Sequence, residues 1–278
     1  NETEAVGLSE TNGWWSRIFA DDFDNDGDTD LVVGNLGTNT PFKASVAEPL
    51  SITYGDFLDD GTIIPILCSY NNGKSYPYYS KDEMADQIPS IRKKFLSYED
   101  YADTQLKDIL TSEQLAKTKT VYVKTLQSVY LQNDGNKKFS VKPLPPYAQI
   151  SPINGIVSED IDKDGDKDII IAGNFYPFRT SIGPMDAGMG LVLKGNNTGR
   201  FMPLPYALTG LNIQGDIRNM IKLNAGDKVL LIVAKNNGKI QVFVLDNISN
   251  EPKGLTDVFV YTLRRMNLCK QFNSCESV

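Results

Sequence analysis

The side chains with the clearest chemical pattern are carboxylates, which recur in two copies of a nine-residue acidic motif. The first acidic loop runs from Asp22 to Asp30, and the second acidic loop, 138 residues later, runs from Asp160 to Asp168. Position 6 is glycine in both, and the odd positions are Asp22, Asp24, Asp26, Asp28, Asp30, Asp160, Asp162, Asp164, Asp166 and Asp168. Carboxylates crowded in this way repel one another unless a cation neutralises them.

Oxygen ligands on a tight loop favour a hard cation, and Ca²⁺ accepts about six to eight oxygens in flexible geometry. Glycine at position 6 permits the sharp turn that such a loop needs. Side chains at positions 1, 3, 5 and 9 and the backbone carbonyl at position 7 would be ligands. We therefore predict about two Ca²⁺ per chain, held by the ten aspartates named above. The number of ligands favours an ion that cross-links two strands over an open ion that binds an acidic partner.

Other loops with similar spacing lead into helices. An EF-hand has a bidentate Glu at position 12 and helices on both sides, but position 12 here is Val33 or Ile171. A dockerin-like loop also leads into a helix, whereas the β-branched residues after each acidic loop indicate a strand. A solvated acidic turn without metal is the remaining alternative, which two copies with matched flanks disfavour. We predict a calcium loop that ends in a buried strand.

Composition limits the classes of function. The chain has 278 residues, 41% of them hydrophobic, and a formal net charge of −7, with no basic cluster of the kind that binds nucleic acid. It contains no histidine, which removes the commonest general base, the triads that depend on it and imidazole–zinc sites. No catalytic set of residues is predicted.

The cysteines, the apolar runs and the calcium loops bear on where the chain is expected to work. Cys269 and Cys275 could close a small disulfide, whereas Cys68, in an apolar segment, is predicted to be a buried thiol. No apolar run is long enough to span a membrane, and the polar start at Asn1 shows no signal-peptide pattern. Calcium loops of this kind work where calcium is millimolar, so we expect an extracellular, cell-surface or periplasmic location.

Further repeats follow along the chain. Asp56–Gly61 is a degenerate acidic loop that lacks two ligands, and we predict the same strand–turn–strand shape there without tight calcium binding. Two Asn-Gly hairpins are predicted at 71–74 and 236–239. Residues of about 80–128 show helical spacing and are predicted to be an α-helical insertion, in which Val121–Leu131 is either the last helix or the returning strand. In a last repeat that begins near Gly210, Gly215-Asp216 is predicted to take the place of the acidic loop without its ligands. A strand is predicted at 258–262, and residues 250–278, which show no clear repeat, are left unassigned.

An acidic loop that ends in a buried strand resembles the FG-GAP, or VCBS, repeat of integrin-α-like β-propellers, in which the loop joins two strands of a blade. The resemblance extends over roughly 13–245. Over this range the chain is similar to the ASPIC/UnbV-related surface proteins of Bacteroidetes. The segments that carry it are Gly13-Trp14-Trp15, the first acidic loop with Gly34-Asn35, the insertion, Pro143-Leu144-Pro145 and Asp186-Ala187-Gly188.

This resemblance implies a single all-β domain over 1–278, a β-propeller of about four blade-like units, closed by itself or part of a larger propeller. It implies an extracellular, calcium-stabilised module that binds a protein or glycan without catalysis. The alternatives are a polysaccharide-active propeller enzyme, either a glycosidase or a lyase, and an architectural segment whose partners are other domains of a longer chain. Candidate ligand contacts are the loop aromatics Tyr76, Tyr78, Tyr79, Phe175 and Tyr176.

Overall fold

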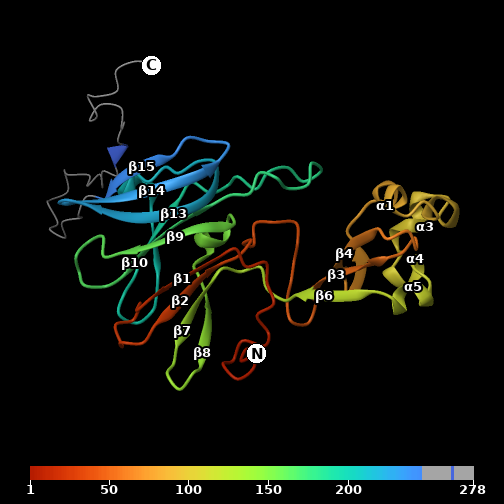
Figure 1. Ribbon diagram of the computed structural model, residues 1–278, viewed down its shortest axis with the longest axis horizontal. Coiled ribbons are helices and arrows are strands. Elements are labelled where there is room, and N and C mark those ends of the chain that lie inside the picture. Colours follow the sequence, from red (N-terminus) through yellow and green to blue (C-terminus); the bar gives the residue numbers. More distant parts are fainter. Residues whose placement is uncertain (246–263, 266–278) are drawn as a thin grey trace, which may run out of the picture. The chain divides into compact units, whose positions relative to one another are not determined.

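The protein is mainly β-sheet, as predicted. The computed structural model describes residues 1–245 and 264–265. Within them lie four antiparallel sheets of four strands each (Figure 1). The chain divides into two compact units, described separately below. The first unit comprises Asn1–Leu8, Trp15–Asn39 and the described part of Gln127–Val278, and the second comprises Ser9–Trp14 and Thr40–Leu126.

Each sheet of the first unit is a meander whose strands pair in chain order, although the segment Thr40–Leu126 of the second unit separates β2 from β7 in the first sheet. The first sheet contains β1 (Arg17–Asp21), β2 (Asp30–Gly34), β7 (Val129–Asn133) and β8 (Phe139–Pro143). The second contains β9 (Ile153–Glu159), β10 (Asp168–Gly173), β11 (Leu191–Lys194) and β12 (Met202–Leu204). The third contains β13 (Asp216–Ala225), β14 (Lys228–Asn236), β15 (Gln241–Leu245) and β16 (Arg264–Arg265). The acidic loops join β1 to β2 and β9 to β10, and the helix α6 (Tyr206–Thr209) precedes the third sheet.

The second sheet is covered on both faces. On β10, Ile169 and Ile171 pack into a core shared with the first sheet, while Ile170 packs into a core shared with the third. Successive side chains of a strand point to opposite faces, so a run of three isoleucines is what a strand between two sheets requires. The first strands β1, β9 and β13 lie beside one another (Figure 1).

Two glycines permit close backbone approach at the start of β9: Gly34 approaches it from the first sheet, and Gly173 approaches it from within the second sheet. A Cβ added at Gly34 would overlap the carbonyl oxygen of Ile153, and one added at Gly173 would overlap that of Pro152. These glycines end β2 and β10, the second strands of the first two sheets. The Gly-Asn pair that follows each acidic loop in the sequence therefore marks a place where two backbones nearly touch.

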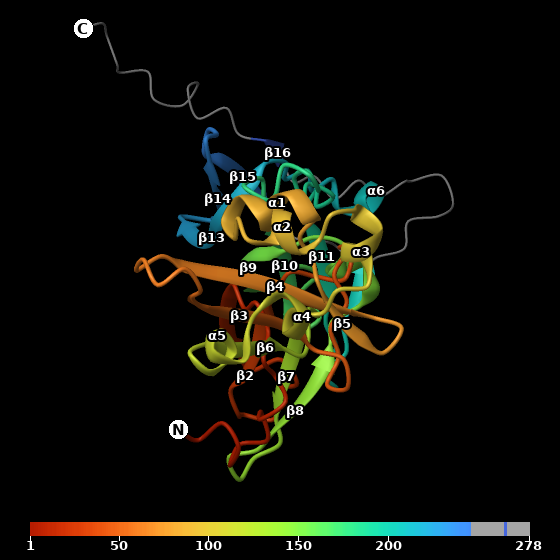
Figure 2. The same ribbon diagram turned by 90° about the vertical axis from the view of Figure 1, so that its right-hand side faces the viewer.

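The second unit pairs a sheet with helices. Its sheet has the order β5 (Lys74–Pro77), β4 (Ile63–Asn71), β3 (Leu50–Asp56) and β6 (Lys119–Val123). Its helices are α1 (Lys81–Gln87), α2 (Ile91–Lys94), α3 (Tyr98–Ala102), α4 (Leu106–Ile109) and α5 (Ser112–Ala116) (Figure 2). Ile64 and Ile66 of β4 pack against Met84, Ile88 and Ile91. Capping boxes at Ser80, Ser97 and Thr111 begin three of the helices.

Several details differ from the sequence predictions. The predicted insertion of about 80–128 contains the helices α1–α5, and its last part, for which helix and strand were both open, forms β6. The compact unit around it also contains a sheet. Gly215-Asp216 was assigned to the place of an acidic loop in the last repeat. Asp216 instead begins β13, and the turn that corresponds to an acidic loop lies at Gly226-Asp227, which is too short to carry ligands.

The predicted features near the C-terminus cannot all be placed. Cys269, Cys275 and the strand predicted at 258–262 lie outside the described residues. Cys68 is a buried free thiol, as predicted, and burial raises its pKa to about 11. Within residues 1–245 and 264–265, no helix is long and apolar enough to cross a membrane.

Replacing Gly173 with Ala is expected to lower the free energy of unfolding by about 2–3 kcal/mol, because the new methyl group must displace backbone atoms. Gly238→Ala is the matched control, since its Cβ would meet Lys235 Cβ at 3.2 Å and would lie 3.8 Å from the nearest backbone atom, the carbonyl oxygen of Asn236. Urea unfolding followed by far-UV circular dichroism measures both. Equal effects of the two substitutions would contradict the close approach.

Candidate metal centre

The two acidic loops and the degenerate loop (Asp56–Ile64) adopt one backbone conformation. Position 4 is left-handed in each, at Asn25 (φ 59°), Lys163 (φ 59°) and Asp59 (φ 54°). Position 6 is a glycine with positive φ in each, namely Gly27, Gly61 and Gly165. Left-handed backbone favours glycine and is tolerated by asparagine and aspartate. Spacing in the sequence therefore specifies the loop conformation three times.

The same hydrogen bonds close each loop. The position-6 N–H donates to the position-1 carboxylate, at 3.1 Å for Gly27 to Asp22 and 3.1 Å for Gly165 to Asp160. In the degenerate loop, the N–H of Gly61 lies 2.8 Å from Asp56 Oδ2. The turn thus closes with its own hydrogen bonds, and the remaining carboxylate oxygens stay available to a cation.

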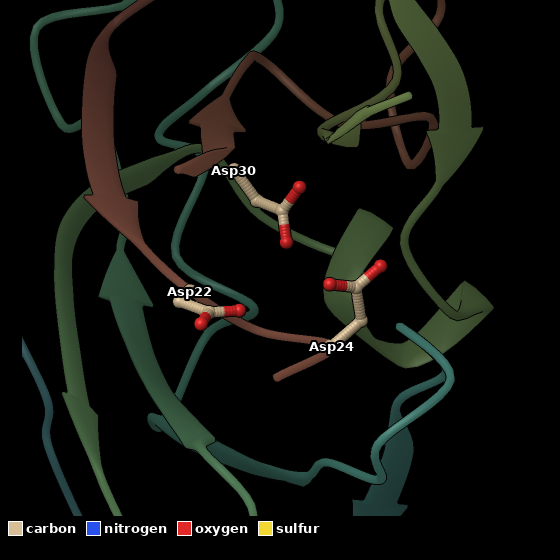
Figure 3. Close-up of side chains that lie close together, drawn as sticks. All are labelled: Asp22, Asp24 and Asp30. Carbon is tan, nitrogen blue, oxygen red and sulfur yellow. The ribbon is translucent and has the colours of Figure 1, made fainter. Parts of the chain in front are cut away.

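The first acidic loop brings three carboxylates together. Asp22, Asp24 and Asp30 each offer an oxygen within 4.8 Å of the others, and the three groups face a common space (Figure 3). Asp22 follows β1, and Asp30 begins β2, so an ion between them would connect two paired strands.

The position-9 carboxylate also binds the third strand of its sheet. Asp30 accepts hydrogen bonds from the N–H groups of Phe23 (3.2 Å) and Asn133 (2.7 Å) and from the hydroxyl of Tyr130 (2.6 Å). Burial, followed by the hydrogen bond to Asp30, raises the pKa of Tyr130, so its hydroxyl remains a donor. Asp30 is fully buried, and these donors compensate for the loss of water.

The second acidic loop repeats the arrangement with Asp160, Asp162 and Asp168. Asp168 accepts from the N–H groups of Ile161 and Gly195, both at 2.9 Å. One difference is a cationic side chain at this cluster. The Nζ of Lys194 contacts Asp162 and lies 2.9 Å from Asp164 Oδ2.

The remaining predicted ligands lie outside the two clusters. Their carboxylates mostly brace the turns: Asp26 accepts from the N–H of Asp28 at 2.8 Å, and Asp164 accepts from that of Asp166 at 3.0 Å. The side chain of Asp166 accepts hydrogen bonds from Asn25 (3.1 Å) and from the N–H of Asn197 (3.2 Å). Positions 1, 3 and 9 therefore form the cluster, while Asp26, Asp28, Asp164 and Asp166 are not brought into it.

The electrostatics and the unpartnered oxygens of the two clusters favour a cation. Burial, and then the charges of Asp30 and Asp26, raise the pKa of Asp24. The buried Oδ1 atoms of Asp22, Asp24 and Asp160 have no hydrogen-bond partner among the described residues. A buried carboxylate oxygen without a donor is costly, and a hard cation satisfies several at once. The donor set therefore fits a metal ion such as Ca²⁺.

The degenerate loop shows what the backbone does without these ligands. Leu58 and Ile64 stand at its positions 3 and 9, and Ile64 is buried in the core of the second unit. The loop still joins two strands, β3 and β4. Loss of the ligands is thus compatible with the strand–turn–strand shape, as predicted for this loop.

Two residues beside the clusters were missed by sequence reasoning. Gln132 donates to Asp24 Oδ2 at 2.5 Å, and Lys194 occupies the corresponding place in the second sheet. Leu31 pairs with Leu131, and Ile169 pairs with Leu193, so Gln132 and Lys194 each follow the residue opposite position 10. Alignment of two similar segments of the sequence, Tyr130-Leu131-Gln132 and Val192-Leu193-Lys194, could have found them.

A polar cleft lies beside the third sheet. Its volume is about 620 Å³, and its lining includes Tyr176, Asp216, Asn236 and Lys239. Asp216 accepts hydrogen bonds from Arg218 (2.8 Å) and Asn236 (3.1 Å). Of the loop aromatics proposed as ligand contacts, Tyr176 lines this cleft with 46% of its surface exposed.

Comparisons with protein-family models and with curated proteins find no match for this chain.

In calcium-free protein, stability is expected to depend on pH through Asp168. Burial raises its pKa to about 6, above the value of about 3.9 for an unfolded Asp. The favourable contribution of its neutral form is therefore complete below about pH 4 and is lost as the pH rises through about 6.

Asp168→Asn should remove this dependence. We expect the pH profiles of the two unfolding free energies, measured in urea with chelator, to diverge by roughly 1–3 kcal/mol between about pH 4 and pH 7. Profiles that remain parallel would contradict the burial of an ionisable carboxyl at this position.

Proposed function

We propose that this chain is an extracellular, calcium-stabilised β-propeller module of the FG-GAP/VCBS type, which binds a protein or glycan ligand without catalysis. The observation that carries the proposal is the repeated cluster. Asp22, Asp24 and Asp30 recur as Asp160, Asp162 and Asp168, each on the loop between the first and second strands of a sheet.

The packing of the first unit supports blade-like sheets. Its three sheets are meanders with adjacent first strands, and the second sheet is covered by the other two. Radial repetition of four-stranded meanders is the propeller architecture. The sheet of the second unit has the same number of strands and carries the degenerate loop, which supports a common origin of the repeats.

The ion has a structural role in this proposal. Bound Ca²⁺ would supply positive charge where carboxylates of the first two strands meet. Asp30 and Asp168 would hold it while accepting hydrogen bonds from the N–H groups of Asn133, on β7, and Gly195, directly after β11. The chain's own residues thus connect the ion to three strands, and ligand binding is assigned to another surface.

The cleft beside the third sheet is the surface we assign to ligand binding. Its polar groups and the exposed ring of Tyr176 are the kind of lining that binds hydroxyl-rich or peptide ligands by hydrogen bonds and stacking.

Calcium is expected to raise the melting temperature of the protein, and Asp22→Asn should reduce this increase because it removes one ligand of the first loop. Asp56→Asn is the matched control, since Asp56 holds the same position in the loop that lacks ligands. It should lower the melting temperature equally with calcium and with chelator. Scanning calorimetry measures the shifts, and equal calcium increments in all three proteins would overturn the metal site.

Ligand binding is tested with immobilised glycans and with extracellular-matrix proteins, in calcium. A ligand of the cleft should bind Tyr176→Ala at least about tenfold more weakly, which corresponds to about 1.4 kcal/mol. Tyr206→Ala is the control, since Tyr206 is similarly exposed, at 55%, on α6. Equal loss in both variants, or a bound ligand insensitive to either, would remove the cleft from the proposal.

A further inference from the structure

The two acidic clusters differ in the residue that approaches them from the third strand. In the first sheet this residue is Gln132, which is neutral, and in the second it is Lys194, which is cationic. The strand registers Leu31–Leu131 and Ile169–Leu193 make the two positions equivalent. The comparison is therefore between matched places in two copies of one structure.

Among the residues that the structure describes, the first cluster is contacted by the neutral Gln132 and by no cationic side chain. Its Nε2 donates to Asp24 Oδ2 at 2.5 Å, and its Oε1 accepts a hydrogen bond from Lys142. Lys142 pairs with Tyr130 across β7 and β8. The amide of Gln132 therefore lies between the ammonium group of Lys142 and the carboxylate of Asp24.

Lys194 brings its charge directly into the second cluster. Its Nζ contacts Asp162, which is 7% exposed, and lies 2.9 Å from Asp164 Oδ2. The side chain of Lys194 is itself 30% exposed, so its charge is partly shielded from water at this contact.

We propose that Lys194 is an internal cation that substitutes for calcium in the second acidic loop, so that the two loops bind calcium with unequal affinity. This inference rests on the proposed calcium site. An ion entering the second loop must displace an ammonium group that already neutralises Asp162 and Asp164. An ion entering the first loop displaces a neutral amide from Asp24. Opposite charges at contact distance in a partly buried site interact strongly, so displacement of Lys194 carries the larger cost.

Unequal affinity would make the two loops depend on calcium to different degrees. The first loop depends on calcium to neutralise its carboxylates, and it adjoins the aromatic cluster of Phe23, Tyr130 and Phe201, whose ring centroids are 5.4–6.0 Å apart. The carboxylates Asp162 and Asp164 of the second loop remain neutralised by Lys194 when calcium is low. Calcium concentration would therefore influence the packing of the first sheet on the second, while the conformation of the second loop would depend less on calcium.

Isothermal titration of calcium into chelator-treated protein tests the proposal. The wild-type protein should show one tight site and one site at least roughly tenfold weaker. Lys194→Gln should tighten the weak site by roughly tenfold or more, giving two similar sites. Gln132→Lys should weaken the tight site by a similar factor. Lys167→Gln, which removes the same charge from position 8 of the second loop, should alter neither site selectively.

Circular dichroism in chelator checks that each variant is folded, and metal analysis gives the stoichiometry. Two equally tight sites in the wild-type protein, or a Lys194→Gln variant with unchanged weak affinity, would overturn the inequality but leave calcium binding intact. Absence of calcium binding in every folded variant would overturn the proposed calcium site together with this inference. Asp22→Asn in wild-type background should leave the weak site alone, which assigns the two affinities to their loops.

Discussion

Repulsion between carboxylates in a tight turn is the constraint on which the structure of the first unit depends. The turn places one carboxylate oxygen from each of Asp22, Asp24 and Asp30 within 4.8 Å of the others, because Asp22 directly follows β1 and Asp30 begins the paired strand β2. Like charges at this separation in a partly buried site disfavour the folded loop. The chain limits the cost with backbone donors to Asp30 and leaves the remaining oxygens for a cation. Where the cation is supplied internally, as by Lys194, the same backbone can be kept.

The acidic loops are coupled to the core by the residues between the aspartates. Phe23, at position 2 of the first loop, is fully buried and packs against Tyr130 and Phe201. Phe201 precedes β12 of the second sheet, so the loop and the contact between sheets share a side chain. Tyr130 in turn donates to Asp30. Closure of the first loop and packing of the two sheets are therefore expected to be cooperative.

The loops and their strands could be predicted from sequence because local rules specify them. Glycine at position 6, alternating aspartates and a β-branched run fix the turn and the strand within about a dozen residues. Contacts made across long separations were less accessible. Gln132 lies on a strand that follows the 87-residue segment Thr40–Leu126, so its place beside Asp24 depends on strand pairing. Gly215-Asp216 was misplaced because its residue types resemble a loop while its neighbours form the start of β13.

Calcium binding at the acidic clusters is tested most directly by a crystal structure from crystals grown in millimolar calcium, with anomalous diffraction recorded at long wavelength. We predict an anomalous peak between Asp22, Asp24 and Asp30, with ligand oxygens at about 2.3–2.6 Å, and a weaker peak or Lys194 Nζ at the second cluster. An ordered first loop that holds water and no anomalous peak in saturating calcium would contradict it.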